Sequence, residues 1–247
     1  MRLTVIGSGD AFGSGGRFNT CFRLEAANST ILVDCGASSM VALRQAGVDP
    51  NSIDGIVLSH LHLDHFGGLP FFLLDGQFLS RRERPLAIAG PPGTRERVNA
   101  LLEVTFAGST KSKWRFPWEV SDIAVGEPTD FLGCTVTSTE VIHFSGAPST
   151  ALRVTDGRKT FAYSGDTQWT DALLTVARGA DLFIVECYEY ERDFAGHMTW
   201  KTIRERKADF TSRRIMVTHM NASVLGRLDE IRAAGVLIAE DRLVLDL

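Results

Sequence analysis

Four side chains of the kinds that bind metal ions stand within six consecutive positions, in the run His60-Leu61-His62-Leu63-Asp64-His65. The apolar residues 55–58 directly before this run predict a buried strand, and the glycine-rich residues 66–70 after it predict a turn into a helix. Histidines and a carboxylate at a strand end are seldom explained by packing, so a polar loop with chance histidines is a poor alternative. The chain is therefore expected to form a sheet that carries a ligand-rich cluster at one edge.

Short β-rich segments alternate with helical ones along the whole chain. Strands are predicted at 2–6, 20–26, 30–34, 55–59, 85–89, 131–138, 150–155, 159–163, 181–186 and 213–217. Helices are predicted at 38–46, from Asp64 toward Phe78, and at 95–107, 170–178, 198–208 and 222–234. Asp156-Gly157 predicts a tight hairpin turn. Because no repeat or linker interrupts the pattern, we expect residues 1–247 to form a single domain.

Composition limits the partners and the compartment. A formal net charge of −4 gives no general attraction to nucleic acid or to an anionic membrane. The chain opens directly on a strand and has no apolar run long enough to span a bilayer, so no membrane partner is expected. The four cysteines are far apart and form no C-x-x-C pair, which fits buried free thiols in a reducing compartment. We therefore expect a cytoplasmic protein.

Three further ligand candidates follow apolar runs that predict strands, namely His143, Asp166 and His219. Each of them alone would usually cap a turn. Strand ends meet at one edge of a sheet, however, so residues distant in sequence can converge there. Together with the run at 60–65, they predict one shared site.

The ordered set of seven residues resembles the metallo-β-lactamase-fold hydrolases, and the glycine-rich opening at 7–13 and the segment 32–36 extend the resemblance. The resemblance covers essentially the whole chain. It implies an α/β (α+β) fold, a four-layer αβ/βα sandwich with metals at one edge. By position, it implies one metal held by His60, His62 and His143, a second held by Asp64, His65 and His219, and Asp166 bridging both.

The implied donors are imidazoles and carboxylates, which suit Zn²⁺, with Mn²⁺ or Fe as alternatives. Two such ions share a water and lower its pKa, so the expected nucleophile is a metal-bridging hydroxide rather than a side chain. Asp64 is expected to act in catalysis as well, by orienting that water or accepting its proton. Asp34 is expected either to support a ligand histidine or to cap a turn.

His197 resembles the additional histidine of the ribonuclease Z and phosphodiesterase branch, where it assists the departing oxygen. A histidine suits that role because its pKa lies near neutrality; contact with backbone at a helix start is the alternative. Only twenty-two residues separate His143 from Asp166, so the arm with which ribonuclease Z grips transfer RNA is absent. The expected substrate is a small or short single-stranded phosphodiester, without a large RNA footprint.

Two segments have more than one interpretation. The basic and aromatic residues 111–118 suit a loop packed on the sandwich, a contact to substrate, or a lid or dimer contact. The aromatic side chains of Tyr188, Tyr190, Phe194 and Trp200 suit either a pocket wall or the core, and no role is evident for Glu186 and Glu189.

The expected function is that of a metal-dependent phosphodiesterase. The first alternative is hydrolysis of a lactone, thioester or sulfate ester on the same metals. The second alternative is a non-catalytic metal-binding interaction module, and the resemblance leaves a homodimer open.

Overall fold

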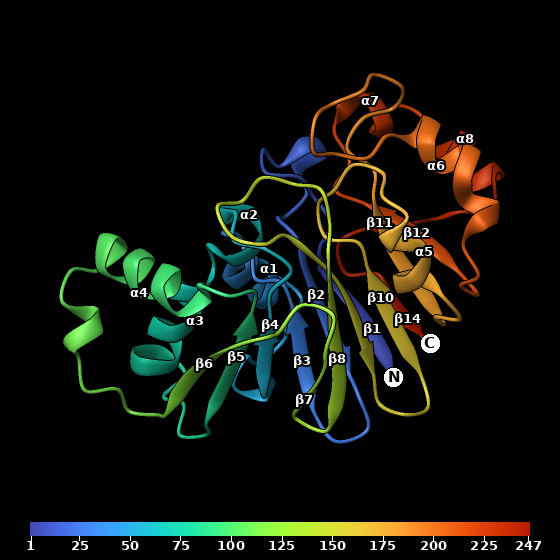
Figure 1. Ribbon diagram of the computed structural model, residues 1–247. Coiled ribbons are helices and arrows are strands. Elements are labelled where there is room, and N and C mark those ends of the chain that lie inside the picture. The colour runs from blue at the N-terminus through green and yellow to red at the C-terminus, as the bar shows by residue number, and fades with distance from the viewer.

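The computed structural model describes residues 1–247 as two seven-stranded mixed sheets that face each other (Figure 1). In strand order, the first sheet contains β14 (Val244–Asp246), β1 (Arg2–Gly7), β2 (Cys21–Glu25), β3 (Thr30–Val33), β4 (Gly55–Val57), β5 (Leu86–Gly90) and β6 (Trp118–Asp122). The second contains β13 (Leu237–Ile238), β12 (Ile215–Thr218), β11 (Leu182–Glu186), β10 (Thr160–Tyr163), β9 (Thr150–Thr155), β8 (Cys134–Glu140) and β7 (Pro128–Phe131). Each sheet is parallel in one half, β3 to β6 or β10 to β13, and antiparallel in the other.

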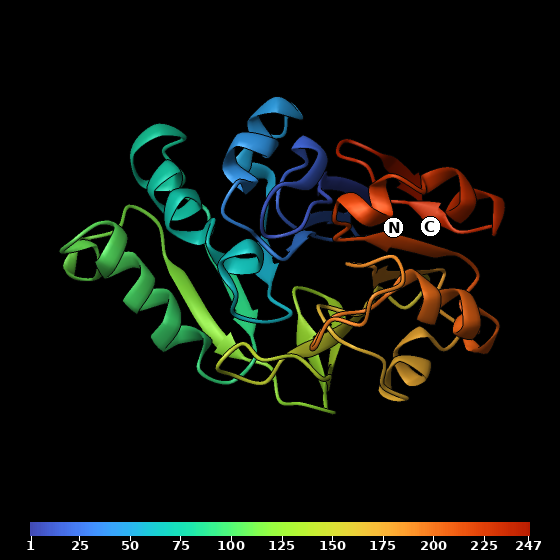
Figure 2. The ribbon, with the colours of Figure 1, turned by 90° about the horizontal axis from the view of Figure 1, so that it is seen from above.

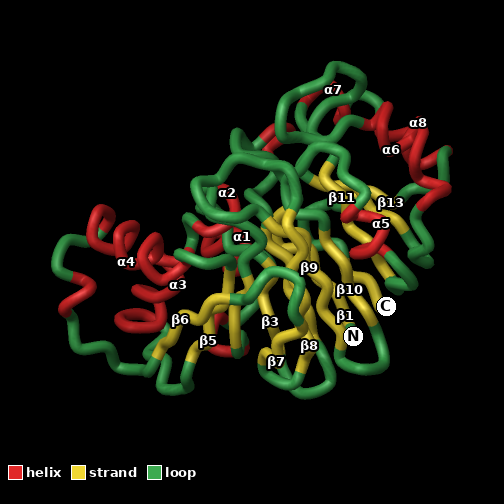
Figure 3. The backbone as a smooth tube through the Cα atoms, in the orientation of Figure 1, coloured by secondary structure: helices red, strands yellow, loops and turns green.

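Helices cover the outer face of each sheet, which completes the four expected layers (Figures 2 and 3). The first sheet is covered by α1 (Ser39–Gln45), α2 (Leu63–Phe66), α3 (Leu69–Leu74) and α4 (Thr94–Thr105). The second is covered by α5 (Ala172–Ala177), α6 (Trp200–Arg206), α7 (Ala222–Leu225) and α8 (Leu228–Ala233). A π-helical turn, η3 (Asp75–Leu79), continues α3, and 3-10 turns occupy η1 (Ser14–Gly16), η2 (Pro50–Ser52), η4 (Ser109–Lys111) and η5 (Lys207–Asp209).

The core between the sheets follows from the alternation of side chains along each strand. Inward positions of both sheets form one fully apolar cluster, in which Phe22 of β2 meets Phe161 and Tyr163 of β10. The ring centroid of Phe22 lies 6.2 Å from that of Phe161 and 5.3 Å from that of Tyr163. Such tilted aromatic pairs add about 0.5–1.5 kcal/mol each beyond the burial of their area. The two sheets are thereby fixed relative to each other beneath the edge that carries the site.

Several predicted elements differ in detail. The strand expected at 131–138 is a hairpin of β7 and β8, because Leu132 and Gly133 adopt positive φ and turn the chain. The helix expected at 222–234 is divided into α7 and α8, and the one from Asp64 toward Phe78 into α2, α3 and η3. Strands β6, β13 and β14 were not predicted. None of the helices has the length and hydropathy that a membrane span requires.

The carboxyl ends of the parallel strands meet at one edge of the sandwich, as in other open α/β sheets with a ligand site. Asp34 follows β3, and His60 follows β4 after a short turn. On the second sheet, Asp166 follows β10 and His219 follows β12. The topology therefore brings polar residues from both sheets to the same place.

Candidate metal centre

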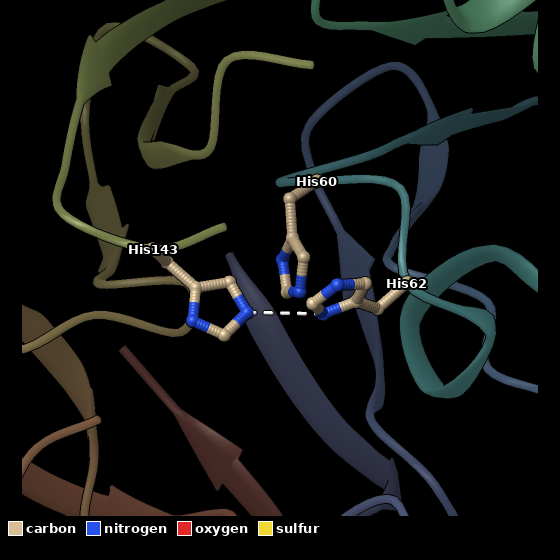
Figure 4. Close-up of side chains that lie close together, drawn as sticks. All are labelled: His60, His62 and His143. Carbon is tan, nitrogen blue, oxygen red and sulfur yellow. Dashed lines mark hydrogen bonds between the residues drawn. The ribbon is translucent and has the colours of Figure 1, made fainter. Parts of the chain in front are cut away.

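The first group of potential ligands consists of His60, His62 and His143, and one nitrogen from each ring lies within 4.8 Å of the other two (Figure 4). His60 and His62 come from the turn between β4 and α2, and His143 comes from the loop after β8. The Nε2 atom of His143 lies 3.0 Å from Nδ1 of His62. The three rings converge from two sheets, as a three-coordinate imidazole site requires.

The second group consists of Asp64, His65, Asp166 and His219, again with ligand atoms within 4.8 Å of one another. The Asp64 Oδ2 atom lies 3.3 Å from Nε2 of His65 and 3.1 Å from Nε2 of His219. Since Asp64 and His65 are neighbours in the single turn of α2, their side chains enter the site together. His219 adopts a φ of 60°, an uncommon conformation for a residue other than glycine and one found at functional sites.

Asp166 lies between the two groups. Its Oδ2 atom is 3.3 Å from Nε2 of both His65 and His219. The same atom is 3.9 Å from Nε2 of His60 and 4.0 Å from Nε2 of His143. One carboxylate therefore faces the ring nitrogens of both groups.

These residues fit divalent metal ions because their inward-facing atoms lack other partners. Nε2 of His60, Nε2 of His65 and Oδ1 of Asp166 are buried without a hydrogen bond. An orphaned buried polar atom costs about 1–3 kcal/mol, so three in one place call for a partner that accepts electron pairs. A donor set of nitrogen and oxygen atoms, without sulfur, suits Zn²⁺, Mn²⁺ or Fe.

The environment of the site favours an ionised carboxylate at Asp166 and neutral imidazoles at His60 and His143. Burial alone would raise the pKa of Asp166, but His219 and His65 hold this pKa well below its usual range. Burial lowers the pKa of His60 well below its usual value, and burial lowers the pKa of His143 to about 4. Neutral imidazoles and ionised carboxylates are the forms that bind metal, so His65, whose pKa Asp166 and Asp64 raise despite burial, would release a proton on binding.

Hydrogen bonds from the outer nitrogens of His65 and His143 fix these two rings. His65 donates from Nδ1 to the buried carboxylate of Asp34 at 2.7 Å, and that carboxylate also accepts from the amide and hydroxyl of Ser59. His143 donates from Nδ1 to the carbonyl of Gly196 at 2.8 Å. Such partners orient a ligand ring and raise its basicity. Of the two roles expected for Asp34, the structure supports that of partner to a histidine.

Glu186 is a functional candidate that sequence reasoning missed. It ends β11, is fully buried, and its Oε1 atom pairs with Nδ1 of His197. Its Oε2 atom accepts hydrogen bonds from the amides of Thr167 at 2.7 Å and Met198 at 3.2 Å. A signal was present in the sequence, since a glutamate ending an apolar strand stands at the same kind of position as Asp166 and His219.

His197 lies beside both groups, in a turn that begins at Phe194. Its ring centroid is 4.9 Å from that of His143 and 5.9 Å from that of His219. Burial raises the pKa of Glu186 and lowers that of His197, which favours one proton shared between them. With Nδ1 engaged by Glu186, Nε2 is the nitrogen that remains for a substrate.

A cavity of about 150 Å³ opens over these residues. It is lined by His62, Asp64, Asp166, His197 and His219 together with Ala11, Phe12, Tyr188 and Phe194. Tyr188 and Phe194 therefore act as pocket walls, as one interpretation of the sequence expected. Trp200, by contrast, is completely buried in the core, and Tyr190 bonds to Glu230 on the outside.

The basic and aromatic segment 111–118 lies away from this cavity and packs on the sandwich. Phe116 is buried, and the Trp114 ring lies 5.6 Å from that of Trp118. Gln77 of η3 bonds to the backbone of Lys113 and of Arg115. These contacts support the interpretation of a packed loop.

Comparison with known proteins identifies the family. Residues 1–238 match the family described as anti-Pycsar protein Apyc1. The chain belongs to the Apyc1 family. Among its relatives, the probable metallo-hydrolase YhfI of Bacillus subtilis (strain 168) is 29% identical over 228 residues, which cover 89% of this chain and 87% of that protein. A ribonuclease Z of Mycobacterium sp. (strain KMS) is 28% identical over 192 residues, covering 74% of this chain and 67% of that protein.

Solved structures agree with this Apyc1-family assignment. The crystal structure of the metallo-β-lactamase fold protein YhfI from Bacillus subtilis matches 99% of this chain and 98% of its own, with 25% identity and a TM-score of 0.78. Human tRNase Z, short form, matches 100% of this chain and 99% of its own, with 23% identity and a TM-score of 0.80, a likeness of fold alone. The expected metallo-β-lactamase fold and the expected class, a metal-dependent hydrolase, are confirmed.

Proposed function

We propose that this protein is a dinuclear metal-dependent phosphodiesterase that acts on a small or short single-stranded phosphodiester. The observation that carries the proposal is the position of Asp166, whose one carboxylate faces two separate groups of ligand atoms. His60, His62 and His143 would hold one ion, and Asp64, His65 and His219 the other. When bound, the two cations would lower the pKa of a shared water and neutralise charge on the phosphate oxygens.

In this proposal, Asp64 has a second role at the centre. Its carboxylate lines the cavity, and the imidazoles of His65 and His219 keep its pKa low despite burial. An ionised carboxylate at this place orients a water molecule by accepting its hydrogen bond. We therefore assign to Asp64 both ligation and the orientation of the attacking water.

His197 and Glu186 would supply the proton for the departing alcohol. If Glu186 carries the shared proton, His197 is neutral with a proton on Nε2; if His197 carries it, both ring nitrogens are protonated. In both arrangements Nε2 has a proton to give, and the pair returns to neutral imidazole and carboxylate afterward. A positioned acid of this type contributes about 10²–10⁴-fold to the rate.

The choice of a small phosphodiester rests on the size of the site and on the relatives. The cavity is small, about 150 Å³, which suits a phosphate and its nearest substituents better than a long polymer. Between His143 and Asp166 the chain forms only β9, β10 and short loops, which leaves no place for an RNA-gripping arm. Relatives named ribonuclease Z and a fold neighbour described as a diphosphatase from the PhnP family point to phosphate substrates. Lactone, thioester or sulfate-ester hydrolysis remains the competing chemistry, and a non-catalytic metal-binding module the competing role.

The test combines metal analysis with hydrolysis of bis(p-nitrophenyl) phosphate. The Zn²⁺- or Mn²⁺-loaded protein should contain two ions per chain and release p-nitrophenolate. His62→Ala and Asp166→Ala should lose both metal and turnover, while Phe144→Ala, an exposed side chain outside the cavity, should keep both. Retained turnover in either ligand variant, or absence of turnover with two ions bound, would overturn the proposed phosphodiesterase.

We also propose that two copies pair through an apolar groove on the first sheet's helices. The groove is formed by α1, α3, η3 and the end of α4, with Met40, Val41, Leu74 and Phe106 among its walls. Phe78 is 72% exposed and Leu79 71% exposed on the π-helical turn. Val41, Phe71 and Phe106 are also exposed, so these side chains form one contiguous apolar patch of the kind that a protein interface covers.

The patch contains both a groove and the exposed side chains of Phe78 and Leu79, and across a two-fold axis the side chains of each copy would meet the groove of the other. Phe78→Asp should place a charge in that interface and shift the protein from dimer to monomer in sedimentation equilibrium. Wild-type protein that is monomeric at micromolar concentration would overturn the pairing without affecting the proposed catalysis.

A further inference from the structure

The cavity over the ligand groups has an unusual wall, the side chain of Phe12. This ring is 82% exposed, although it lines the cavity together with Asp64 and His219. A single exposed phenylalanine is common on protein surfaces, but this one borders the ligand groups, where its apolar face would gain from being covered by a bound molecule. Phe144 is equally exposed at 83% and follows His143, but it does not line the cavity.

The turn that carries Phe12 is fixed by a buried carboxylate. Asp10 is completely buried, and its Oδ1 atom accepts hydrogen bonds from the amides of Phe12 at 3.1 Å and Ser14 at 2.9 Å. The Oδ2 atom of Asp10 accepts a hydrogen bond from the Ser14 hydroxyl at 2.6 Å. The side-chain amide of Asn19 donates to the backbone carbonyl of Asp10 at 2.9 Å. Burying a carboxylate is costly unless it is fully hydrogen-bonded. Here the three bonds of the carboxylate go to one turn, so the backbone at Phe12 is held in place.

The remaining walls of the cavity are also aromatic. The Tyr188 ring lies 5.2 Å from that of Phe194 and 4.8 Å from that of His197. These rings come from the loop after β11, whereas Phe12 comes from the loop after β1, so the cavity has aromatic walls from both sheets. The polar floor is formed by the ligand groups.

We propose that Phe12 determines specificity by stacking on a planar aromatic ring attached near the phosphate, such as a nucleobase or an aryl group. This inference rests on the proposed function, which places the phosphate at the ligand groups. The stacking contact with Phe12 is additional, because the metal chemistry does not need it. Stacking accepts any flat ring, because every such ring has a π-face, and it requires no hydrogen-bonding partner. No lysine or arginine lines the cavity, which fits recognition by stacking rather than by additional phosphate contacts.

The experiment measures binding, so that it does not depend on turnover. Thymidine 5′-phosphate and deoxyribose 5-phosphate are titrated calorimetrically into Zn²⁺-loaded protein, because the second ligand keeps the sugar and phosphate of the first but has a hydroxyl in place of the base. The wild type should bind the thymidine compound roughly 10- to 100-fold more tightly, the range expected for one stacked base. Phe12→Ala and Phe12→Leu should lose most of this preference, and Phe12→Trp should restore it.

Phe144→Ala is the matched control and should keep the preference, because it removes an equally exposed ring outside the cavity. Equal affinity of the wild type for the two ligands, or a preference that survives in Phe12→Ala, would overturn the stacking role. Hydrolysis of bis(p-nitrophenyl) phosphate is measured on the same samples. A base preference without turnover would contradict the phosphodiesterase while supporting the stacking role, so the two failures are distinguishable.

Discussion

Replacing Glu186 by glutamine should remove acid catalysis while leaving the fold and the metal ligands in place. The Oε2 atom accepts two backbone hydrogen bonds, from Thr167 and Met198, so the amide oxygen of a glutamine must occupy that position. The amide nitrogen then faces Nδ1 of His197, where Glu186 has an oxygen. Because this nitrogen only donates, Nδ1 has to accept, and a protonated imidazole ring is excluded.

The size of the effect follows from this change of partner. In Glu186→Gln, a neutral His197 could give its Nε2 proton only by becoming an anion. In the wild type, the Glu186 carboxyl gives its own proton to Nδ1 as Nε2 loses one, so the ring stays neutral. The loss should therefore be most of the factor of about 10²–10⁴ that a positioned acid supplies. It should affect only substrates whose leaving group needs a proton.

The assay compares two phosphodiesters at saturating concentration. Thymidylyl-thymidine, with an alkoxide leaving group, should lose roughly 100-fold or more in kcat with Glu186→Gln. Bis(p-nitrophenyl) phosphate, whose leaving group departs without assistance, should change by less than about threefold under the same reasoning. His197→Ala should reproduce the pattern, and Tm and metal content serve as controls because Glu186 also lies 3.7 Å from Nδ1 of His219. An equal loss with both substrates at unchanged metal content would refute the reasoning.

Three further predictions concern metal affinity and stability. Asp34→Asn weakens the support of the His65 ring and should lower metal affinity about 10- to 100-fold in a chelator competition; unchanged affinity would contradict its role. Tyr163→Phe removes a buried hydroxyl without a hydrogen-bond partner and should raise the free energy of unfolding by about 1 kcal/mol, whereas a lower Tm would mean that the hydroxyl has a partner. For Asp181, burial would raise the pKa, but the amide of Thr160 and the ammonium of Lys159 hold it below its usual value. This carboxylate therefore stabilises the fold above the unfolded pKa of about 4, and the contribution is lost as the pH falls through the lower folded pKa. Asp181→Asn should lower Tm at pH 7 by about 2–4 °C and flatten the dependence of Tm on pH between about 5 and 3, and an unaltered acid profile would contradict this.

The sequence was most informative where apolar strands end in polar residues. His60, Asp166 and His219 were recognisable because each interrupts an apolar run, and the parallel topology then brings them to one edge. Glu186 occupies a position of the same kind, but its partner His197 is placed by a turn whose shape no local pattern reveals. The pairing of Glu186 with His197 is therefore visible only in the folded structure.

The elements that were missed depend on contacts between distant parts of the chain. Strand β14 has only three residues and exists because it pairs with β1, more than two hundred positions away. The hairpin at Leu132 places a leucine at positive φ, a conformation that its side chain disfavours and that a sequence pattern does not predict. Likewise, the turn that carries Phe12 depends on hydrogen bonds to the buried Asp10, which the composition of the loop does not reveal.

Each of the two ligand groups takes residues from both sheets, His60 and His62 with His143 in one, Asp64 and His65 with Asp166 and His219 in the other. During synthesis, His219 leaves the ribosome long after Asp64 and His65, so the second group cannot assemble until nearly the whole chain has been made, whereas the last member of the first group is His143. Ions bound here would also cross-link the halves of the sandwich, since opening the sheets would break coordination at both positions. Ion capture would then be a late event in biogenesis. The loaded protein should also resist unfolding more than the same protein after removal of its ions.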